Sequence, residues 1–157
     1  RTTNIRLSAE AHNGQLVPPG GIFSFNLVVG ERVTEKGYMP ADIYVDNTVV
    51  KGLGGGVCQT SSTLYQAVRQ ANLEIVERHR HTLPVDYVPP QGDATVAYGL
   101  LDFRFRNDTS SYVLISAETG KNYLRIRLFG KADARHPAIR QPQAYPQSAL
   151  SDLPWKK

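Results

Sequence analysis

The chain contains a single cysteine, Cys58, and this count limits the ways in which it can fold. One cysteine excludes any intramolecular disulfide and any thiolate-rich zinc site, so the structure depends on a buried core. The length of 157 residues is sufficient for one domain with such a core, and 41% of the residues are hydrophobic. This globular composition argues against wholesale disorder. We therefore expect one folded domain.

The sequence shows no membrane anchor or leader. No apolar run approaches the roughly 18 residues that cross a bilayer. No basic stretch followed by an apolar one stands at the N-terminus, so the chain is not expected to be an intact secretory precursor. It opens with Arg1 in place of methionine, which indicates a processed or excised domain. We predict no transmembrane segment in this chain.

The formal net charge of +4 is concentrated near the C-terminus. Residues 1–130 carry 13 Lys and Arg against 12 Asp and Glu, whereas residues 131–157 carry five basic and two acidic residues. Nucleic-acid binders cluster cations on a folded face, so no nucleic-acid partner is predicted. The same C-terminal segment holds four of the ten prolines, which is typical of an extended linker or surface strap. We predict a domain at residues 1–130 and a proline-rich basic tail at 131–157.

Two segments have the pattern of amphipathic helices. Residues 4–13 start at Asn4, a good N-cap, and stop at Asn13. Residues 59–71 are the best helix of the chain, with an apolar stripe widened by a tyrosine, and Asn72 can end it in a left-handed conformation. Three hydroxyl side chains are candidates to cap its start: Thr60, Ser61 and Ser62.

Strand signals dominate the second half of the chain. A short strand pair is expected near residues 43–50, with Asp46 and Asn47 as turn residues. Residues 73–79 alternate as a strand does, and further strands with hairpin connections are predicted at 95–105, 112–117 and 123–129. The predicted fold class is α+β, with a short N-terminal helix and a central cysteine-bearing helix packed on a mostly antiparallel sheet.

The most unusual stretch surrounds the cysteine. Gly54, Gly55 and Gly56 permit positive backbone dihedrals and a close approach to a bound group. Cys58 follows at a predicted helix N-terminus, where unpaired amides and the helix dipole favour the thiolate. The same amides, with Gln59, can stabilise an oxyanion during acyl transfer. The block is therefore a candidate nucleophile and substrate-binding site.

A thiolate nucleophile usually needs a base, most often histidine. His79 and His81 follow the central helix, and on a continuous strand both would point to one face beside the cysteine. Asp93 or Asp102 could orient the imidazole and fix its tautomer. The other two histidines, His12 and His136, are interpreted as ordinary helix or surface residues.

Other interpretations of these residues stay open. A lone cysteine often packs as a small hydrophobe, and the glycines then only permit close helix packing. Zinc held by Cys58, His79 and His81 is an alternative that lacks a clear fourth ligand. Tyr65, with other scattered tyrosines, could line a glycan groove or simply pack at the edge of the core. The leading prediction includes no metal and no cofactor.

Taken together, these motifs resemble the VanW family, named after an accessory protein of vancomycin-resistance gene clusters. The resemblance covers about residues 1–117, and it departs from the family pattern at Arg80 and Thr82. The matching blocks are Pro19–Asn26, Gly37–Tyr38 with Ala41, Gly54–Tyr65, Glu77–His81, Tyr87–Pro89 and Asp93–Val96. It implies a bacterial, extracytoplasmic envelope protein that can carry other modules, such as a G5 domain, but it implies no particular reaction.

Two functional hypotheses follow. In the first, Cys58 performs acyl transfer or hydrolysis on a cell-wall peptide, assisted by His81 or His79 and by Asp93. In the second, a non-enzymatic module binds peptidoglycan or a protein through the glycine-rich loop and tyrosines. The candidate partners are a cell-wall peptide or glycan and other modules of a longer envelope protein.

Overall fold

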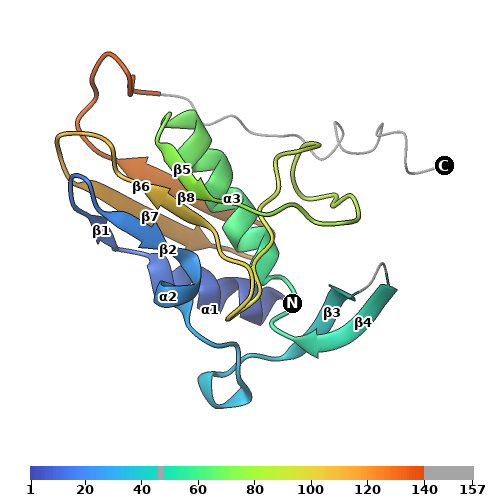
Figure 1. Cartoon of the computed structure of the whole chain (residues 1–157). Helices are drawn as coiled ribbons and strands as arrows, with labels where there is room; N and C mark the ends of the chain where they lie inside the picture. The colour runs from blue at the N-terminus through green and yellow to red at the C-terminus, as the bar shows by residue number, and fades with distance from the viewer. Residues whose placement is uncertain (46–47, 140–157) are drawn as a thin grey trace.

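The computed structural model describes residues 1–45 and 48–139 and has the predicted α+β architecture (Figure 1). The predicted turn at Asp46 and Asn47 and the tail from residue 140 onward lie outside the described residues. In chain order the elements are α1 (Thr2–His12), β1 (Leu16–Val17), β2 (Ile22–Ser24), α2 (Phe25–Val29), the 3₁₀ turn η1 (Thr34–Lys36), β3 (Pro40–Val45), β4 (Thr48–Leu53), α3 (Val57–Gln70), β5 (Glu74–Glu77), β6 (Arg104–Arg106), β7 (Val113–Thr119) and β8 (Leu124–Phe129).

The strands of the described residues form three small antiparallel sheets. Their orders are β1-β7-β8, β2-β6-β5 and β3-β4. Helix α1 packs against β7, α3 packs against β8, and the two helices contact each other (Figure 1). The fold class and the antiparallel pairing are therefore confirmed, including the cysteine on the central helix.

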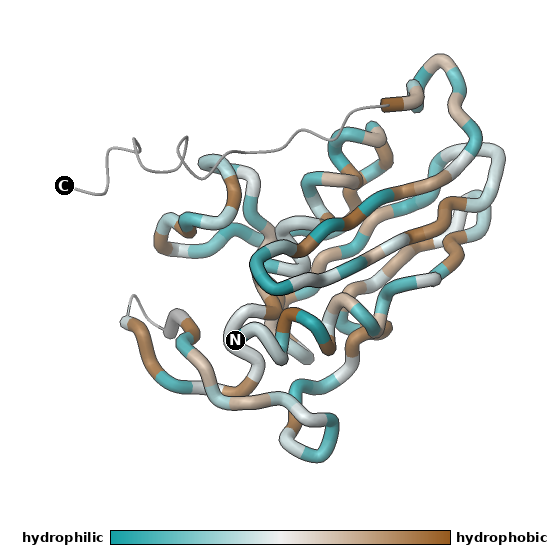
Figure 2. The backbone as a smooth tube through the Cα atoms, turned by 180° about the vertical axis from the view of Figure 1, so that it is seen from behind, coloured by the Kyte–Doolittle hydropathy of each residue, from teal (hydrophilic) through white to brown (hydrophobic). Residues whose placement is uncertain are grey.

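Alternating side chains explain how the sheet and helices share one core. In β7 the residues Val113, Ile115 and Ala117 are buried, and the intervening residues are more exposed. Polar and apolar residues alternate along the strands in Figure 2. Leu64 and Val68, from the predicted stripe of α3, are fully buried. Side chains from both larger sheets and from the helices thus bury one shared set of apolar atoms.

The helix starts differ from the predicted ones because side chains are used elsewhere. Asn4 lies inside α1, fully buried, and its amide nitrogen donates to the carbonyls of Met39 and Gly55. Helix α3 begins after Gly56 without a side-chain cap, and Ser61 and Ser62 are buried within it. Their hydroxyls bind Ala94 instead, at 2.6 Å to its carbonyl and 2.9 Å from its N–H.

The predicted strand at 95–105 is wrong over most of its length. Only Arg104–Arg106 form β6, and residues 78–103 are an irregular segment with isolated bridges at His79–Thr95 and Ala97–Leu101. This segment passes the N-terminal end of α3 (Figure 1). Here hydrogen bonds with the serines of α3 take the place of regular strand pairing. They hold the segment beside the start of α3.

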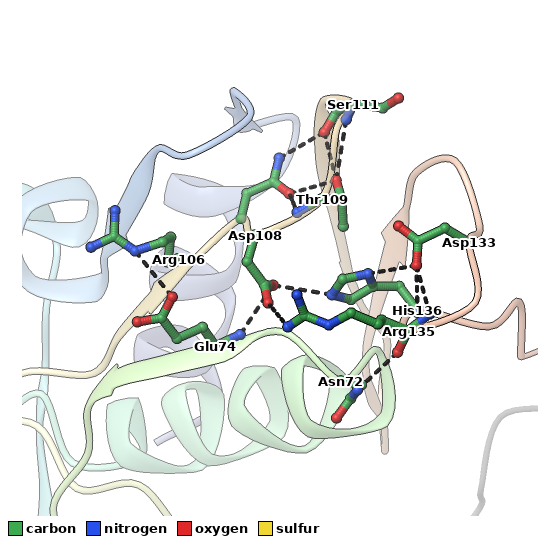
Figure 3. A network of polar contacts seen from close by, with 10 residues as sticks. Asn72, Glu74, Arg106, Asp108, Thr109, Ser111, Asp133, Arg135 and His136 are labelled. Carbon is green, nitrogen blue, oxygen red and sulfur yellow. Dashed lines mark hydrogen bonds and ion pairs between the residues drawn. The ribbon is translucent and has the colours of Figure 1, made fainter.

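The residues after β8 fold back onto the domain through a polar network (Figure 3). His136 is 6% exposed, and its ring nitrogens contact Asp133 at 2.8 Å and Asp108 at 3.1 Å. Arg135 also binds Asp108, and the Asn72 amide donates to the Arg135 carbonyl. The interpretation of His136 as a surface residue is therefore wrong, because two carboxylates satisfy its ring within the fold. Asn72 has a φ of 56°, as predicted for the residue that ends α3.

His12 is on α1 as expected, but it faces the core. Its side chain is fully buried 5.8 Å from the Phe25 ring, and neither ring nitrogen makes a regular hydrogen bond within the described residues. Burial lowers the pKa of His12 to about 4, an effect that the backbone of Ser8 only partly opposes. The neutral imidazole is therefore the form that the fold accepts.

This burial predicts an acid-dependent stability. The pKa of His12 is lower in the native state than in the unfolded state. The stability that the protein has with a neutral, buried His12 is therefore fully present above about pH 6.5 and is lost as the pH falls toward 4. The loss amounts to about 3 kcal/mol near pH 4. We expect the difference in unfolding free energy between wild type and His12→Leu to change by this amount between neutral pH and pH 4 in urea titrations. Parallel pH profiles for the two proteins would contradict it.

Candidate functional site: a cysteine at a helix start

The glycine block before α3 is a close-packed turn. Gly54 and Gly56 have φ angles of 84° and 107°, which favour glycine. A Cβ at Gly55 would lie 2.6 Å from the Asp42 carbonyl oxygen, so a side chain there would collide with β3. The turn brings the backbone into position for Cys58 to be the second residue of α3. The structure therefore gives a packing reason for the glycines at these positions.

The Cys58 sulfur lies between the helix start and the irregular segment. Its Sγ is 3.6 Å from Thr95 Oγ1 and 3.5 Å from the Val96 carbonyl oxygen, and the residue is partly exposed. The neighbouring N–H groups of Val57 and Gln59 donate to the Gly54 and Gly56 carbonyls at 3.0 Å. Between them, the Cys58 N–H has no acceptor among the described residues, as is usual in the first turn of a helix.

His81 and Asp93 form a buried pair beside this cysteine. The His81 Nδ1 lies 2.8 Å from Asp93 Oδ2, and the His81 backbone N–H donates to the same oxygen at 2.6 Å. Their side chains are 8% and 9% exposed. Because the carboxylate occupies Nδ1, the hydrogen sits there in the neutral ring and Nε2 is the free base. The Tyr87 hydroxyl is 3.4 Å from that Nε2.

The electrostatics join Cys58 to this pair. Burial raises the pKa of the Cys58 thiol, but the electrostatic interaction with His81 and the contacts with Thr95 and Val96 outweigh it and hold the pKa below its ordinary value. Burial lowers the pKa of His81, but the thiolate and Asp93 outweigh it and raise the pKa above its usual range. The two opposite shifts favour a thiolate beside an imidazolium.

Arg78 holds Asp93 in this orientation. Its Nε donates to the Asp93 carbonyl at 2.7 Å, and one terminal nitrogen is 3.2 Å from Asp93 Oδ1. The Arg78 guanidinium stacks over the Tyr65 ring, with 4.9 Å from its carbon to the ring centroid. Tyr65 is 8% exposed and also meets Phe103 edge-on, so its ring lies in the core beneath this network. The carboxylate is thereby aimed at His81.

His79 and Asp102 are engaged elsewhere. Strand β5 ends at Glu77, so the alternation that would have placed both histidines on one face does not continue. His79 Nε2 contacts Glu77 Oε1 at 2.9 Å. Asp102 accepts hydrogen bonds from the Ser24 hydroxyl and from backbone N–H groups near it. Of the four candidate partners, the structure brings His81 and Asp93 to Cys58.

A groove of mixed polar and apolar lining lies beside the start of α1. Its volume is about 760 Å³, and it lies between α1, the flank of α3 and the β7–β8 turn. Gln59 and Tyr87 line it, and the Gln59 side-chain oxygen accepts from Arg1 at 3.0 Å. Tyr87 also contacts His81, although neither His81 nor Cys58 is among the described residues that line the groove.

Several residues around the cysteine were not predicted as site residues. Arg78, Tyr87 and Thr95 stand in sequence blocks that resemble the family, which is the signal that could have indicated them. Arg32 lies outside those blocks, and no sequence pattern marks it. Within the described ranges, no group of three or more His, Cys, Asp or Glu side chains is arranged to hold a metal ion. No helix in the same ranges is long and apolar enough to span a membrane.

Comparison with known proteins identifies the family. The family described as VanW like protein matches residues 1–129. The chain is 48% identical over 129 residues to the uncharacterized protein YoaR of Bacillus subtilis strain 168, covering 82% of this chain and 43% of YoaR. It is 30% identical over 112 residues to the vancomycin B-type resistance protein VanW of Enterococcus faecalis strain V583, covering 68% of this chain and 40% of that protein.

These matches confirm the resemblance drawn from the motifs. The chain spans about two fifths of the length of these two curated relatives. No solved structure is similar enough to match it. With the family match extending over the whole folded region up to Phe129, the chain belongs to the VanW-like protein family.

Proposed function

We propose that this domain catalyses cysteine-dependent acyl transfer or hydrolysis on an amide of a cell-wall peptide. The observation that carries the proposal is the Cys58 thiol at a helix start, coupled to a His81 imidazole that a buried Asp93 orients. Nucleophile, base and orienting carboxylate are the three groups that such chemistry uses. The Cys58 N–H supplies a donor for the developing oxyanion.

The reaction divides into two balanced steps. The Cys58 thiolate attacks the amide carbonyl carbon, and the oxygen takes up the electron pair of the C=O bond beside the free N–H. As the C–N bond breaks, the leaving amine takes the proton from the His81 imidazolium, and a thioester remains. His81 then removes a proton from water or from an acceptor amine, which attacks the thioester, and the C–S bond breaks to restore the thiolate.

The family membership supports an envelope setting for this chemistry. One relative is named a vancomycin resistance protein, and vancomycin is a cell-wall antibiotic. We therefore place the domain outside the cytoplasm, with other modules of a longer protein attached to it. The cell-wall peptide as substrate follows from this setting together with the amide chemistry of the site.

A binding module without catalysis is the second candidate. The groove of about 760 Å³ favours it, because its lining combines Arg1, Gln59 and Tyr87 with apolar side chains. In that case, a peptide or glycan would occupy the groove without covalent bonding to the cysteine. The two candidates differ in the requirement for Cys58.

The test is acyl capture from soluble peptidoglycan stem peptides, followed by intact-protein mass spectrometry after an acid quench. We expect an adduct on Cys58 that hydroxylamine removes, and peptide products that require both Cys58 and His81. Cys58→Ser and His81→Gln abolish the products, whereas His79→Gln, two residues away, retains them. Equal peptide binding by wild type and Cys58→Ser, with no product from either, would select the binding module.

A further inference from the structure

A second feature of the site is an unpaired arginine. Both terminal nitrogens of the Arg32 guanidinium are buried, and neither has a hydrogen-bond partner among the described residues. No described carboxylate forms an ion pair with it. These two nitrogens carry four of the five donors of a guanidinium, and leaving buried donors unsatisfied is costly. An anionic partner would satisfy these donors and compensate the positive charge.

Neighbouring residues hold the Arg32 side chain in place without satisfying its charge. The guanidinium carbon lies 5.8 Å from the Phe25 ring centroid and 6.0 Å from that of Tyr98. A Cβ at Gly54 would lie 3.0 Å from Arg32 Cγ, so the stem packs on the glycine turn. Aromatic rings bind the faces of a guanidinium and leave its N–H edge free.

Both segments that hold Arg32 lead directly to the cysteine. Gly54 precedes Cys58 in the same turn, and Tyr98 is two residues beyond Val96, whose carbonyl contacts the sulfur. Two residues span at most about 7 Å of chain. Burial lowers the pKa of Arg32, while electrostatic interactions with Tyr38, Cys58 and Asp102 partly oppose this shift. The contacts with Gly54 and Tyr98 therefore hold the Arg32 side chain in the neighbourhood of the cysteine turn.

Asp102, a carboxylate that interacts electrostatically with Arg32, already accepts several hydrogen bonds. Asp102 Oδ2 accepts from the Ser24 hydroxyl, and Oδ1 accepts from the Asn26 and Phe103 N–H groups at 2.9 Å and 2.8 Å. These bonds tie Asp102 to the start of α2 and to the irregular segment just before β6. The anion that would complete Arg32 has to come from outside the described residues.

We propose that Arg32 binds a carboxylate of the substrate, so that the peptide attacked by Cys58 carries a carboxylate next to the reacting acyl group. This inference rests on the proposed function and names its substrate class. Planar carboxylates match the guanidinium fork with two parallel hydrogen bonds. The bond would orient the peptide while the Cys58 N–H receives the oxyanion.

The test compares two small electrophiles, iodoacetate and iodoacetamide, which differ only in a carboxylate against a neutral amide. In wild type we expect iodoacetate to label Cys58 faster, relative to iodoacetamide, than it labels a free thiol such as glutathione. Arg32→Gln lowers this ratio by about tenfold, because the attracting charge is lost. Arg32→Lys retains part of the preference. Arg127→Gln on β8 removes the same charge away from the site and leaves the ratio unchanged.

The outcomes separate this inference from the proposed function. An unchanged ratio in folded Arg32→Gln, with rapid iodoacetamide labelling, overturns the carboxylate site alone. A wild-type thiol inert to both reagents until unfolding overturns the proposed function and, with it, the inference. If Arg32→Gln does not fold, the carboxylate site is tested by protecting Cys58 of the wild type from labelling with small ligands. N-acetylalanine should slow iodoacetamide labelling, N-acetylalaninamide should not, and equal protection by both contradicts the proposal.

Discussion

Replacing His81 with glutamine is expected to slow the alkylation of Cys58 by iodoacetamide at least about tenfold near pH 6.5, because each unit of pKa changes the thiolate fraction tenfold. The His81 contact opposes burial and holds the pKa of Cys58 below its ordinary value. In the variant, only the contacts with Thr95 and Val96 still oppose burial, so the midpoint of the pH–rate profile moves upward. Stopped-flow labelling across the pH range measures both midpoints.

His79→Gln is the matched control for this experiment. His79 is two residues from His81 and contacts Glu77 at 2.9 Å, so its loss leaves the thiol unaffected. We expect the His79→Gln profile to coincide with that of the wild type. Equal slowing by the two variants would mean that the effect comes from the segment as a whole, and the assignment of His81 as the base would be wrong.

Asp93→Ala is expected to cost about 3–5 kcal/mol of unfolding free energy, since it leaves buried charged partners uncompensated. The carboxylate receives the His81 ring, the His81 backbone N–H and an Arg78 nitrogen. The side chains of Asp93, His81 and Arg78 are 9%, 8% and 17% exposed, so water replaces these bonds poorly. Urea unfolding at neutral pH measures the loss, and wild-type stability would contradict the buried network.

Asp93→Asn keeps the size of the side chain but removes its charge, so it tests the contribution of the charge to stability. Burial raises the pKa of Asp93, but hydrogen bonds from His81 outweigh it and hold the pKa below its usual range. Its charge therefore stabilises the fold above the unfolded pKa of about 3.9 and ceases to do so as the pH falls through the native pKa. We expect the asparagine variant to lack this acid-dependent part. An identical pH profile in the two proteins would assign the acid sensitivity to other groups.

Regular periodicity was the part of the fold that sequence patterns predicted well. The stripe of α3 places Leu64 and Val68 in the core, and β8 alternates Leu124, Ile126 and Leu128 with arginines as expected. These patterns are local, since each follows from the repeat of one element. Residues 78–103 carry no such repeat, and side-chain bonds from α3 determine their course.

The sequence identified the candidate nucleophile, but it left open which histidine is the base. A cysteine after three glycines at the start of an amphipathic stretch indicates a helix N-terminus, and Cys58 lies there. The choice between His79 and His81 depended on where β5 ends, and Glu77 ends it before either histidine. The partner of the imidazole likewise depended on Arg78, which binds Asp93 over the Tyr65 ring.

By itself, the sequence determined the family, the α+β class and the address of the one thiol, because motif spacing and periodicity are properties of neighbouring residues. Only the tertiary structure decided which histidine interacts with that thiol and which aspartate binds this histidine. It also decided that His12 is buried and that the terminal nitrogens of Arg32 are unpaired among the described residues. Burial and charge pairing depend on segments far apart in the chain. Cys58 and Asp93 are 35 residues apart in sequence, and they lie in the same site only because α3 and the irregular segment pack together.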